Sequence, residues 1–196
     1  MSDILNKSVV LVLNRNWQAI NVRTPADAFC QMATDAATGL DIDGAEFIRP
    51  VRWAEWRELP AREQDWSVNT VHGPIRVPTV IVALNYARVP MKRPAFNGRN
   101  LRERDGNRCQ YTGELIKPED GSIDHIVPRS RGGENTWENC VWSKKSVNNR
   151  KSARLPREAG LKLLRQPKAP APMPVTAFIR NPLGIEDWKV FLGATG

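Results

Sequence analysis

The sequence has few of the residues that mark a disulfide-bonded or membrane protein. Its 196 residues include only three cysteines, Cys30, Cys109 and Cys140, and their spacing forms no pair. A small, odd number of cysteines argues against a disulfide framework and favours a reducing compartment, so we predict a cytoplasmic protein. The apolar run Val9–Leu13 is far too short to cross a bilayer, and we expect no membrane partner.

Histidine is rarer still, with two residues in the chain. His72 lies in the sequence V-H-G-P-I, which is typical of a turn, and it has no acidic neighbour in sequence. We therefore expect no catalytic role for His72. His125 instead follows Asp124 directly, and the pair opens the stretch Asp124–Lys151, which carries the most informative pattern in the sequence.

Acidic residues are outnumbered, and the formal net charge is +8. Residues 92–168 contain eighteen Lys and Arg but nine Asp and Glu, whereas the rest of the chain contains eleven and twelve. A concentrated basic region is typical of a protein that binds a polyanion, because each neutralised phosphate releases counterions. A solvated basic face is the alternative interpretation. The basic region coincides with the motif at Asp124–Lys151, and we therefore predict a nucleic-acid partner.

The motif itself predicts a hairpin followed by a helix. Ser122–Val127 alternates polar and apolar residues and is predicted to be a strand that ends before Pro128. The glycines of Ser130–Gly133 indicate a loop. Asn139–Trp142 is predicted to be a second short strand, and Ser143–Leu155 a helix that buries Val147 and Leu155. Each of these pieces contributes one polar residue that can face a common point.

Four polar residues of this stretch suit phosphodiester hydrolysis. The carboxylate of Asp124 and the amide oxygen of Asn148 are hard ligands of the kind that Mg²⁺ prefers, and Mg²⁺ needs few protein groups. Histidine is a common general base, and His125 can take a proton from an attacking water. Asn139 is an uncharged donor and acceptor that can fix the loop between the strands.

The stretch resembles the HNH endonucleases with the ββα-metal fold. The resemblance rests on D-H-I-V-P-R-S-R-G-G, then W-E-N-C-V, then N-N-R-K, in this order and spacing. It implies that Asp124 and Asn148 hold one Mg²⁺ or Mn²⁺, that His125 is the general base, and that Asn139 orients the catalytic loop. Lys151 matches the basic residue of the N-x-x-K ending of the family.

The resemblance predicts the nuclease core, and the patterns along the rest of the chain predict the domain organisation. We expect an α+β protein, with a ββα-metal (HNH) nuclease core and a mixed α/β N-terminal region. Residues 1–90 would form the N-terminal region, as a target-recognition or scaffold unit. Residues 91–165 would form the nuclease domain, and residues 166–196 a proline-rich C-terminal extension that docks back on the body.

One departure from the family concerns zinc. Many members carry two C-x-x-C pairs that hold a structural zinc around the core. This chain keeps Cys109 but has Thr112, Lys144 and Val147 at the other three positions. One thiolate of four cannot make a tetrahedral zinc site, so we expect no structural zinc and a hairpin held by packing.

Outside the motif, the sequence predicts further strands and helices. The N-terminal region should contain strands at Ser8–Leu13, Gln18–Val22, Leu40–Ile42, Phe47–Val51 and Val77–Leu84. The sequence T-P-A-D predicts a helix that starts at Thr24 and ends near Gly39. Tyr86–Arg102 is a basic connector that can also touch a phosphate backbone. After the core, Leu155–Arg165 predicts a short helix, and Trp188 and Phe191 are spaced to dock on one face.

We therefore predict a divalent-metal-dependent DNA endonuclease that acts on double-stranded DNA. The residues predicted to contact phosphate flank the catalytic residues: Arg129, Arg131, Lys144, Lys145, Arg150 and Lys151. Three alternatives remain at this stage. They are a nucleic-acid-binding protein with an HNH-like fold and little or no catalysis, a nuclease that acts on RNA, and an assembly protein with a basic face. The sequence also leaves a homodimer open.

Overall fold

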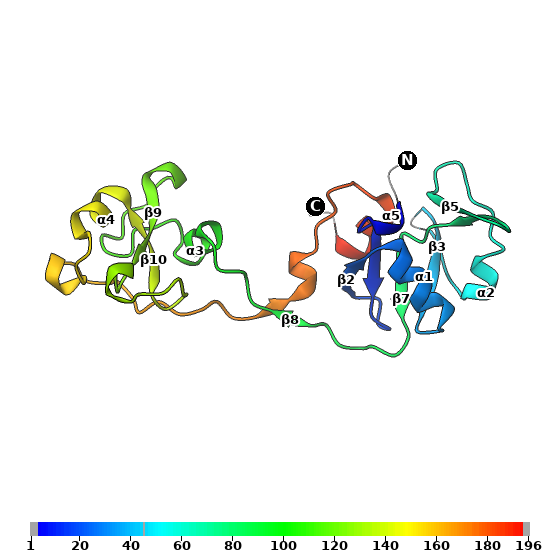
Figure 1. The fold of residues 1–196 in the computed structure, drawn as a ribbon, viewed down its shortest axis with the longest axis horizontal. Coiled ribbons are helices and arrows are strands. Elements are labelled where there is room, and N and C mark those ends of the chain that lie inside the picture. The colour runs from blue at the N-terminus through cyan, green and yellow to red at the C-terminus, as the bar shows by residue number, and fades with distance from the viewer. Residues whose placement is uncertain (1–3, 45, 194–196) are drawn as a thin grey trace. The chain divides into compact units, whose positions relative to one another are not determined.

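The computed structural model describes residues 4–44 and 46–193, so the outermost residues of the expected N-terminal region and C-terminal extension lie outside the described part. The chain forms two compact units (Figure 1). Residues 93–173 form the second unit, and the described residues on both sides of it, up to 92 and from 174, form the first. The second unit is therefore inserted into the sequence of the first. Helices and mainly antiparallel sheets make the chain an α+β protein.

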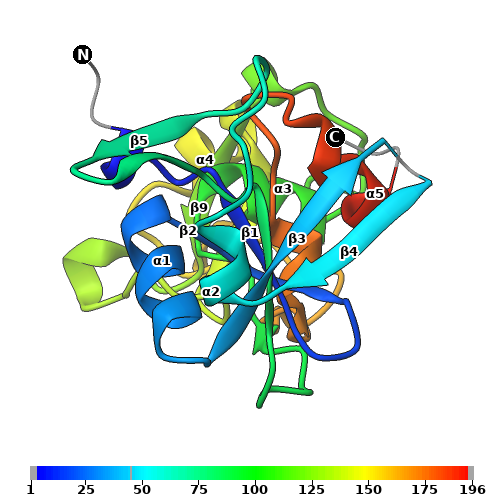
Figure 2. The same ribbon diagram turned by 90° about the vertical axis from the view of Figure 1, so that its right-hand side faces the viewer.

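The first unit is built on a five-stranded sheet with the strand order β2-β1-β7-β3-β4. Its strands are β1 (Val10–Leu13), β2 (Ala19–Arg23), β3 (Ala37–Asp43), β4 (Phe47–Val51) and β7 (Val80–Ala83). β1 and β7 pair in parallel, and the other neighbours are antiparallel. All four residues of β1 are buried, as expected of a central strand. Figure 2 shows the long strands β3 and β4 side by side.

Helix α1 (Pro25–Ala33) begins where the sequence predicts and ends earlier. The Thr24 hydroxyl accepts a hydrogen bond from the Asp27 backbone N–H at 3.2 Å, which is a normal N-cap. The predicted extension to Gly39 is wrong. The residues after Thr34 turn into β3, where Ala37 pairs with Ala83 and Gly39 with Ile81. Pairing with β7 outweighs the helix propensity of the alanines in this segment.

Helix α5 (Glu186–Leu192) completes the core of the first unit from the far end of the sequence. Trp188 is 1% exposed, and its indole N–H donates a hydrogen bond to the Thr79 carbonyl at 2.8 Å. The Thr79 hydroxyl donates to Asp187 at 2.6 Å. Trp188 and Ile185 belong to the same apolar cluster as β1 and β7. The segment after the insertion is therefore part of the body that precedes it.

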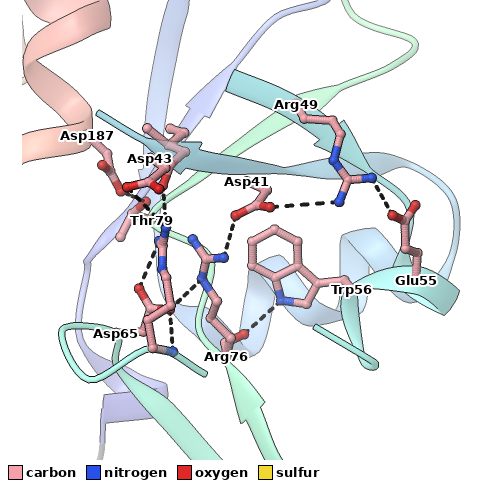
Figure 3. A network of polar contacts seen from close by, with 11 residues as sticks. Asp41, Asp43, Arg49, Glu55, Trp56, Asp65, Arg76, Thr79 and Asp187 are labelled. Atoms are coloured by element: carbon pink, nitrogen blue, oxygen red, sulfur yellow. Dashed lines mark hydrogen bonds and ion pairs between the residues drawn. The ribbon is translucent and has the colours of Figure 1, made fainter. Parts of the chain in front are cut away.

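A buried arginine joins several elements of the first unit (Figure 3). Arg76 lies in β6 (Gly73–Arg76), which pairs with β5 (Ser67–Thr70). Its guanidinium contacts Asp41 at 2.5 Å and Asp65 at 2.9 Å. It also lies 5.2 Å from the ring of Trp56, which is buried in α2 (Trp53–Trp56). Burial raises the pKa of Asp65, but hydrogen bonds from Arg62 and the charges of both arginines outweigh burial, so the pKa lies below its ordinary value.

The second unit contains an antiparallel strand pair and two short helices. The strands are β9 (Gly121–His125) and β10 (Cys140–Lys144), and the helices are α3 (Gly98–Arg104) and α4 (Lys145–Lys151). Single 3-10 turns lie at Pro118–Asp120, Arg129–Arg131 and Arg157–Ala159. The predicted helix at Ser143–Leu155 is shorter than expected, because Ser143 and Lys144 extend β10. The predicted helix at Leu155–Arg165 is reduced to one 3-10 turn.

The remaining elements are short. Two-residue strands β8 (Met91–Lys92) and β11 (Met173–Pro174) pair at the ends of the insertion, and 3-10 turns lie at Ile4–Asn6 and Val175–Phe178. In residues 4–44 and 46–193, no helix has the length and apolar character needed to cross a membrane.

Candidate active site

The strand register brings the predicted site residues together. In the β9–β10 pair, His125 lies opposite Cys140 and Asp124 opposite Val141, while Asn139 immediately precedes β10. Helix α4 follows β10 directly and contacts both strands. This order places the end of β9, the loop before β10 and the middle of α4 around one point. Asp124 is 2% exposed, whereas His125 is only half-buried.

Asp124 is held by two partners. The Lys151 ammonium donates to Asp124 Oδ1 at 2.8 Å, and the Tyr111 hydroxyl donates to Oδ2 at 2.5 Å. Lys151 also donates to the His125 carbonyl at 2.7 Å. Lys151 is 1% exposed, so the ion pair is shielded from water. A buried carboxylate needs such partners, because an unpaired charge in the interior is costly.

Tyr111 stays protonated in this environment. Burial is the main cause that raises its pKa, and the hydrogen bond to Asp124 and the negative charge of Asp124 raise it further. The pKa therefore lies far above the ordinary value of a tyrosine. Tyr111 is a permanent hydrogen-bond donor to Asp124 at neutral pH.

His125 is oriented by Asn135. The Nε2 atom of His125 lies 2.6 Å from the Asn135 Oδ1 atom. A carboxamide oxygen can only accept, so Nε2 carries the proton and Nδ1 is the basic nitrogen of the neutral ring. A neutral histidine with a free Nδ1 lone pair can accept a proton from water.

Asn139 closes the loop between β9 and β10. Its Oδ1 accepts from the Val127 backbone N–H at 2.9 Å, and its Nδ2 donates to the carbonyls of Val127 and Glu134 at 3.1 and 3.0 Å. The same place requires a glycine, because a Cβ on Gly133 would lie 1.7 Å from the Val127 oxygen and 2.8 Å from Asn139 Nδ2. The loop thus depends on one amide and one glycine.

Asn148 faces the same region from α4. Its Nδ2 donates to the Ser122 hydroxyl at 3.0 Å and to the Ile123 carbonyl at 3.1 Å. These two bonds fix the orientation of the amide, and they leave the Oδ1 atom of Asn148 available to accept a contact. Within the described residues, no donor bonds this oxygen.

An open pocket of about 300 Å³ joins these residues. Its lining includes Asp124, His125, Arg129, Ser130, Asn148 and Ser152. A divalent cation fits this donor set, because each carboxylate oxygen of Asp124 can accept more than one contact and the Asn148 oxygen has no donor in the described residues. No three His, Cys, Asp or Glu side chains gather into a metal-binding group in the described part of the chain. The pocket thus offers one carboxylate and one amide, with room for waters.

The predicted phosphate contacts divide into three groups. Arg129 lines the pocket and is exposed, and Lys145 and Arg150 are exposed on α4. Arg131 instead pairs with Glu158 at 2.9 Å, and Lys144 pairs with Glu114 at 2.8 Å. Lys151 points inward to Asp124, so the prediction of a surface phosphate contact at Lys151 does not agree with its burial.

Two of the four positions considered for a structural zinc, Cys109 and Val147, are buried. Cys109 and Val147 belong to one buried apolar cluster with Tyr111 and Trp142. Burial raises the pKa of the Cys109 thiol, but hydrogen bonds from Thr112 and from the Lys144 backbone outweigh burial and lower it. The thiol is thus surrounded by protein donors and apolar side chains.

Two residues of this site were not predicted from the sequence, namely Tyr111 and Asn135. Tyr111 lies thirteen residues before Asp124, and no spacing rule connects a lone tyrosine to a distant carboxylate. Asn135 lies in the loop that the glycines signal, but its direction toward His125 depends on the folded loop. Both contacts are tertiary.

Two family models match parts of the chain. A family model described as HNH endonuclease matches residues 109–157. A second family model, described as HNH endonuclease-associated, N-terminal domain, matches residues 10–91. No curated protein matches the chain. The first match includes the strand pair, the loop between the strands and α4. Together, the two matches support an assignment of the chain to the HNH endonuclease family.

Proposed function

We propose that this protein is a divalent-metal-dependent endonuclease that hydrolyses phosphodiester bonds of double-stranded DNA. The observation that carries the proposal is the single pocket lined by Asp124, His125 and Asn148. These are the three residue types that metal-assisted hydrolysis at phosphorus needs. We further propose that β9, β10 and α4 form the ββα-metal core of the family.

His125 acts as the general base. Asn135 holds the proton on Nε2, so Nδ1 takes the proton of the attacking water. Asn139 keeps the loop and thereby the ring of His125 in place. The resulting hydroxide attacks phosphorus in line, and the bond to the 3′ oxygen breaks, which leaves a 5′ phosphate and a 3′ hydroxyl.

Asp124 and Asn148 would hold one Mg²⁺ or Mn²⁺. A cation bound there supplies charge stabilisation for the scissile phosphate and the leaving oxygen. Tyr111 and Lys151 donate hydrogen bonds to Asp124 and thereby fix the position of its carboxylate at the pocket. Arg129, Lys145 and Arg150 provide exposed positive charge beside the pocket for the flanking phosphates.

One observation favours a second candidate function, a nucleic-acid-binding protein without catalysis. Both oxygens of Asp124 are already bonded, one by Lys151 and one by Tyr111. If these bonds persist when DNA binds, Asp124 contributes little to the binding of a cation. The protein would then bind DNA through its basic surface and would not cleave it. The plasmid assay separates the two candidates.

The test is cleavage of supercoiled plasmid DNA with Mg²⁺, Mn²⁺ or EDTA. We expect nicked or linear DNA with either metal and none with EDTA. His125→Ala should abolish cleavage but leave DNA binding nearly intact, because the ring contributes little to affinity. Arg52→Ala, an exposed arginine of the first unit, serves as the matched control.

The outcomes are distinct. Cleavage that survives in His125→Ala would show that His125 is not the base. Retained DNA binding without cleavage in any metal would favour the binding protein. Cleavage of an RNA of the same sequence without cleavage of DNA would shift the substrate to RNA.

A further inference from the structure

The first unit contains a pocket that the proposed nuclease chemistry does not use, here called the Tyr86 pocket. It measures about 270 Å³ and lies between β2, α1 and the segment that follows β7. Its lining combines apolar residues with the side chains of Asn21, Arg23, Gln31 and Tyr86. Ligand pockets for drug-sized molecules measure about 300–1,000 Å³, so this one suits a smaller group.

The polar groups of this pocket are available to a ligand. Within the described residues, the guanidinium of Arg23, the amide of Gln31 and the hydroxyl of Tyr86 have no hydrogen-bond partner. Asn21 accepts one bond from the Val22 backbone N–H at 2.8 Å, which leaves its amide N–H groups free to donate. Tyr86 is 40% exposed, so one face of its ring is accessible.

The rim beside Tyr86 is held in place by a buried amide. Asn14 is fully buried; its Oδ1 accepts from the backbone N–H groups of Asn16 and Gln18, and its Nδ2 donates to the Ala87 carbonyl at 2.9 Å. The Arg15 backbone N–H donates to the Tyr86 carbonyl at 2.8 Å. Two distant segments are thereby fixed together, and a preorganised rim lowers the cost of binding.

The backbone of the same turn is strained. Trp17 has a φ of 64°, a region that bulky residues rarely occupy, and the surrounding hydrogen bonds keep it there. Its ring is 38% exposed and packs edge-on against Phe191 at 6.0 Å. An exposed tryptophan therefore lies in the turn that is bonded to the Tyr86 segment.

Charge around this pocket favours an anionic polymer. Residues 4–26, 66–102 and 159–185 contain no Asp or Glu, and all the lining residues except Gln31 come from the first two of these ranges. Arg15 and Arg88 are exposed; the Arg15 backbone is bonded to Tyr86, and Arg88 follows Tyr86 by two residues. The nearest acidic residues in sequence, Asp27 and Asp35 at the two ends of α1, do not line the pocket.

Another pocket of the first unit differs from the Tyr86 pocket in the charge of its lining residues. It measures about 350 Å³, and its lining includes Asp43, Asp65, Glu186 and Asp187 but only one arginine, Arg62. A carboxylate-rich pocket repels phosphate. The Tyr86 pocket is therefore the better candidate for DNA.

We propose that the Tyr86 pocket binds one unstacked nucleobase of a DNA strand. The Tyr86 ring stacks on the base, and the amides of Asn21 and Gln31 bond its edge, as side-chain amides do with adenine. Arg23, Arg15 and Arg88 contact the adjoining phosphates. The proposal rests on DNA as the substrate of the second unit (residues 93–173), which is called the nuclease unit below. It assigns target recognition to the first unit.

The test measures binding without catalysis. Fluorescence anisotropy of the full chain in EDTA compares labelled oligo(dA), oligo(dC) and oligo(dT) with an abasic deoxyribose-phosphate oligomer of the same length. We expect the base-containing strands to bind more tightly. Tyr86→Ala should weaken their binding about tenfold, since stacking on an aromatic ring accounts for that order of affinity per base. The abasic strand should respond much less.

Two further variants and one control sharpen the test. Tyr86→Phe keeps the stacking ring and should retain most of the affinity. Gln31→Leu has nearly the same shape and should reduce the differences in affinity between the three bases. Phe47→Ala removes an aromatic ring that is 48% exposed on the edge strand β4, outside the pocket, and should leave binding unchanged.

Several results would overturn the proposal. They are equal binding of the abasic and base-containing strands, equal effects of Tyr86→Ala and Phe47→Ala, or no change in base preference in Gln31→Leu. If Tyr86→Ala fails to fold, the abasic comparison and Gln31→Leu still decide. Plasmid cleavage by the unmodified chain is a separate readout. If the chain cleaves DNA but binds abasic and base-containing strands equally, only the proposal for the pocket is refuted. If binding depends on the base but the chain does not cleave DNA, only the proposed nuclease activity is refuted.

Discussion

The ammonium of Lys151 lies 2.8 Å from the carboxylate of Asp124, and both side chains are almost fully buried. The lysine belongs to α4 and the aspartate to β9, so the ion pair joins the helix to the strand pair. The same ammonium bonds the carbonyl of His125. Lys151 therefore positions both residues on which the proposed chemistry depends, without facing solvent itself.

Lys151→Met should destabilise the nuclease unit by about 3–5 kcal/mol, because it leaves a buried carboxylate without its partner. The loss should shrink in the double variant Asp124→Asn/Lys151→Met, in which neither charge remains. Native-state hydrogen exchange of β9 measures this unit separately from the first one. Equal losses in the single and double variants would show that Lys151 contributes packing rather than charge compensation.

Tyr111→Phe removes the hydrogen bond to Asp124 and should cost about 1.5–3 kcal/mol of stability at pH 7, the range for bonds to charged groups. The folded pKa of Tyr111 is raised above the unfolded value of about 10. Its contribution is therefore complete below pH ~10 and is lost as the pH rises through the folded pKa. The difference in unfolding free energy between the two proteins should be constant from neutral pH to about 9 and should decrease at higher pH. A difference that grew with alkaline pH would contradict the assignment.

Gly133→Ala should abolish plasmid cleavage. Its new methyl group would lie 1.7 Å from the Val127 oxygen, so the loop held by Asn139 must move and take the base with it. Gly98→Ala is the matched control, since its methyl group would meet Ile123 at an ordinary 3.6 Å. Asn139→Ala should reduce cleavage in the same way as Gly133→Ala. Full activity in Gly133→Ala would mean that the loop geometry is not needed for catalysis.

Glu158→Gln should tighten DNA binding and steepen its salt dependence. The substitution releases Arg131 from its ion pair and makes a further cation available to phosphate. Each additional phosphate contact changes the slope of log K against log[salt] by about −0.9 on duplex DNA. Glu114→Gln should do the same for Lys144. Binding titrations at several salt concentrations measure the slope, and an unchanged slope would place both cations outside the interface.

Local signals in the sequence were sufficient for several elements. The cap at Thr24, the strand at Phe47–Val51 and the strand-loop-strand order around Asp124 each depend on neighbouring residues. The predicted end of α1 was wrong because of a long-range contact. Gly39 lies against the ring of Trp56, and a Cβ there would meet that ring at 2.6 Å, so its strand conformation is set by packing across the unit.

The candidate site also combines residues that local sequence patterns predict with residues whose role depends on tertiary contacts. The sequence predicted Asp124, His125, Asn139 and Asn148 as site residues. In the structure, Asp124, His125 and Asn148 line one pocket, and Asn139 bonds the loop between the strands. The burial of Lys151 could not be predicted, because its partner lies 27 residues away and the local sequence N-N-R-K resembles a solvated helix face. Residues that act through tertiary contacts leave no local pattern.

The insertion of one unit into the other determines the order in which the chain can fold during synthesis. The residues of the nuclease unit leave the ribosome before Trp188, whose indole fills the core of the first unit. Domains fold as they emerge, so the nuclease unit can be complete while the preceding unit still lacks α5. A message that stopped between residues 173 and 188 would therefore encode every residue of the proposed active site within a chain whose first unit has an open core.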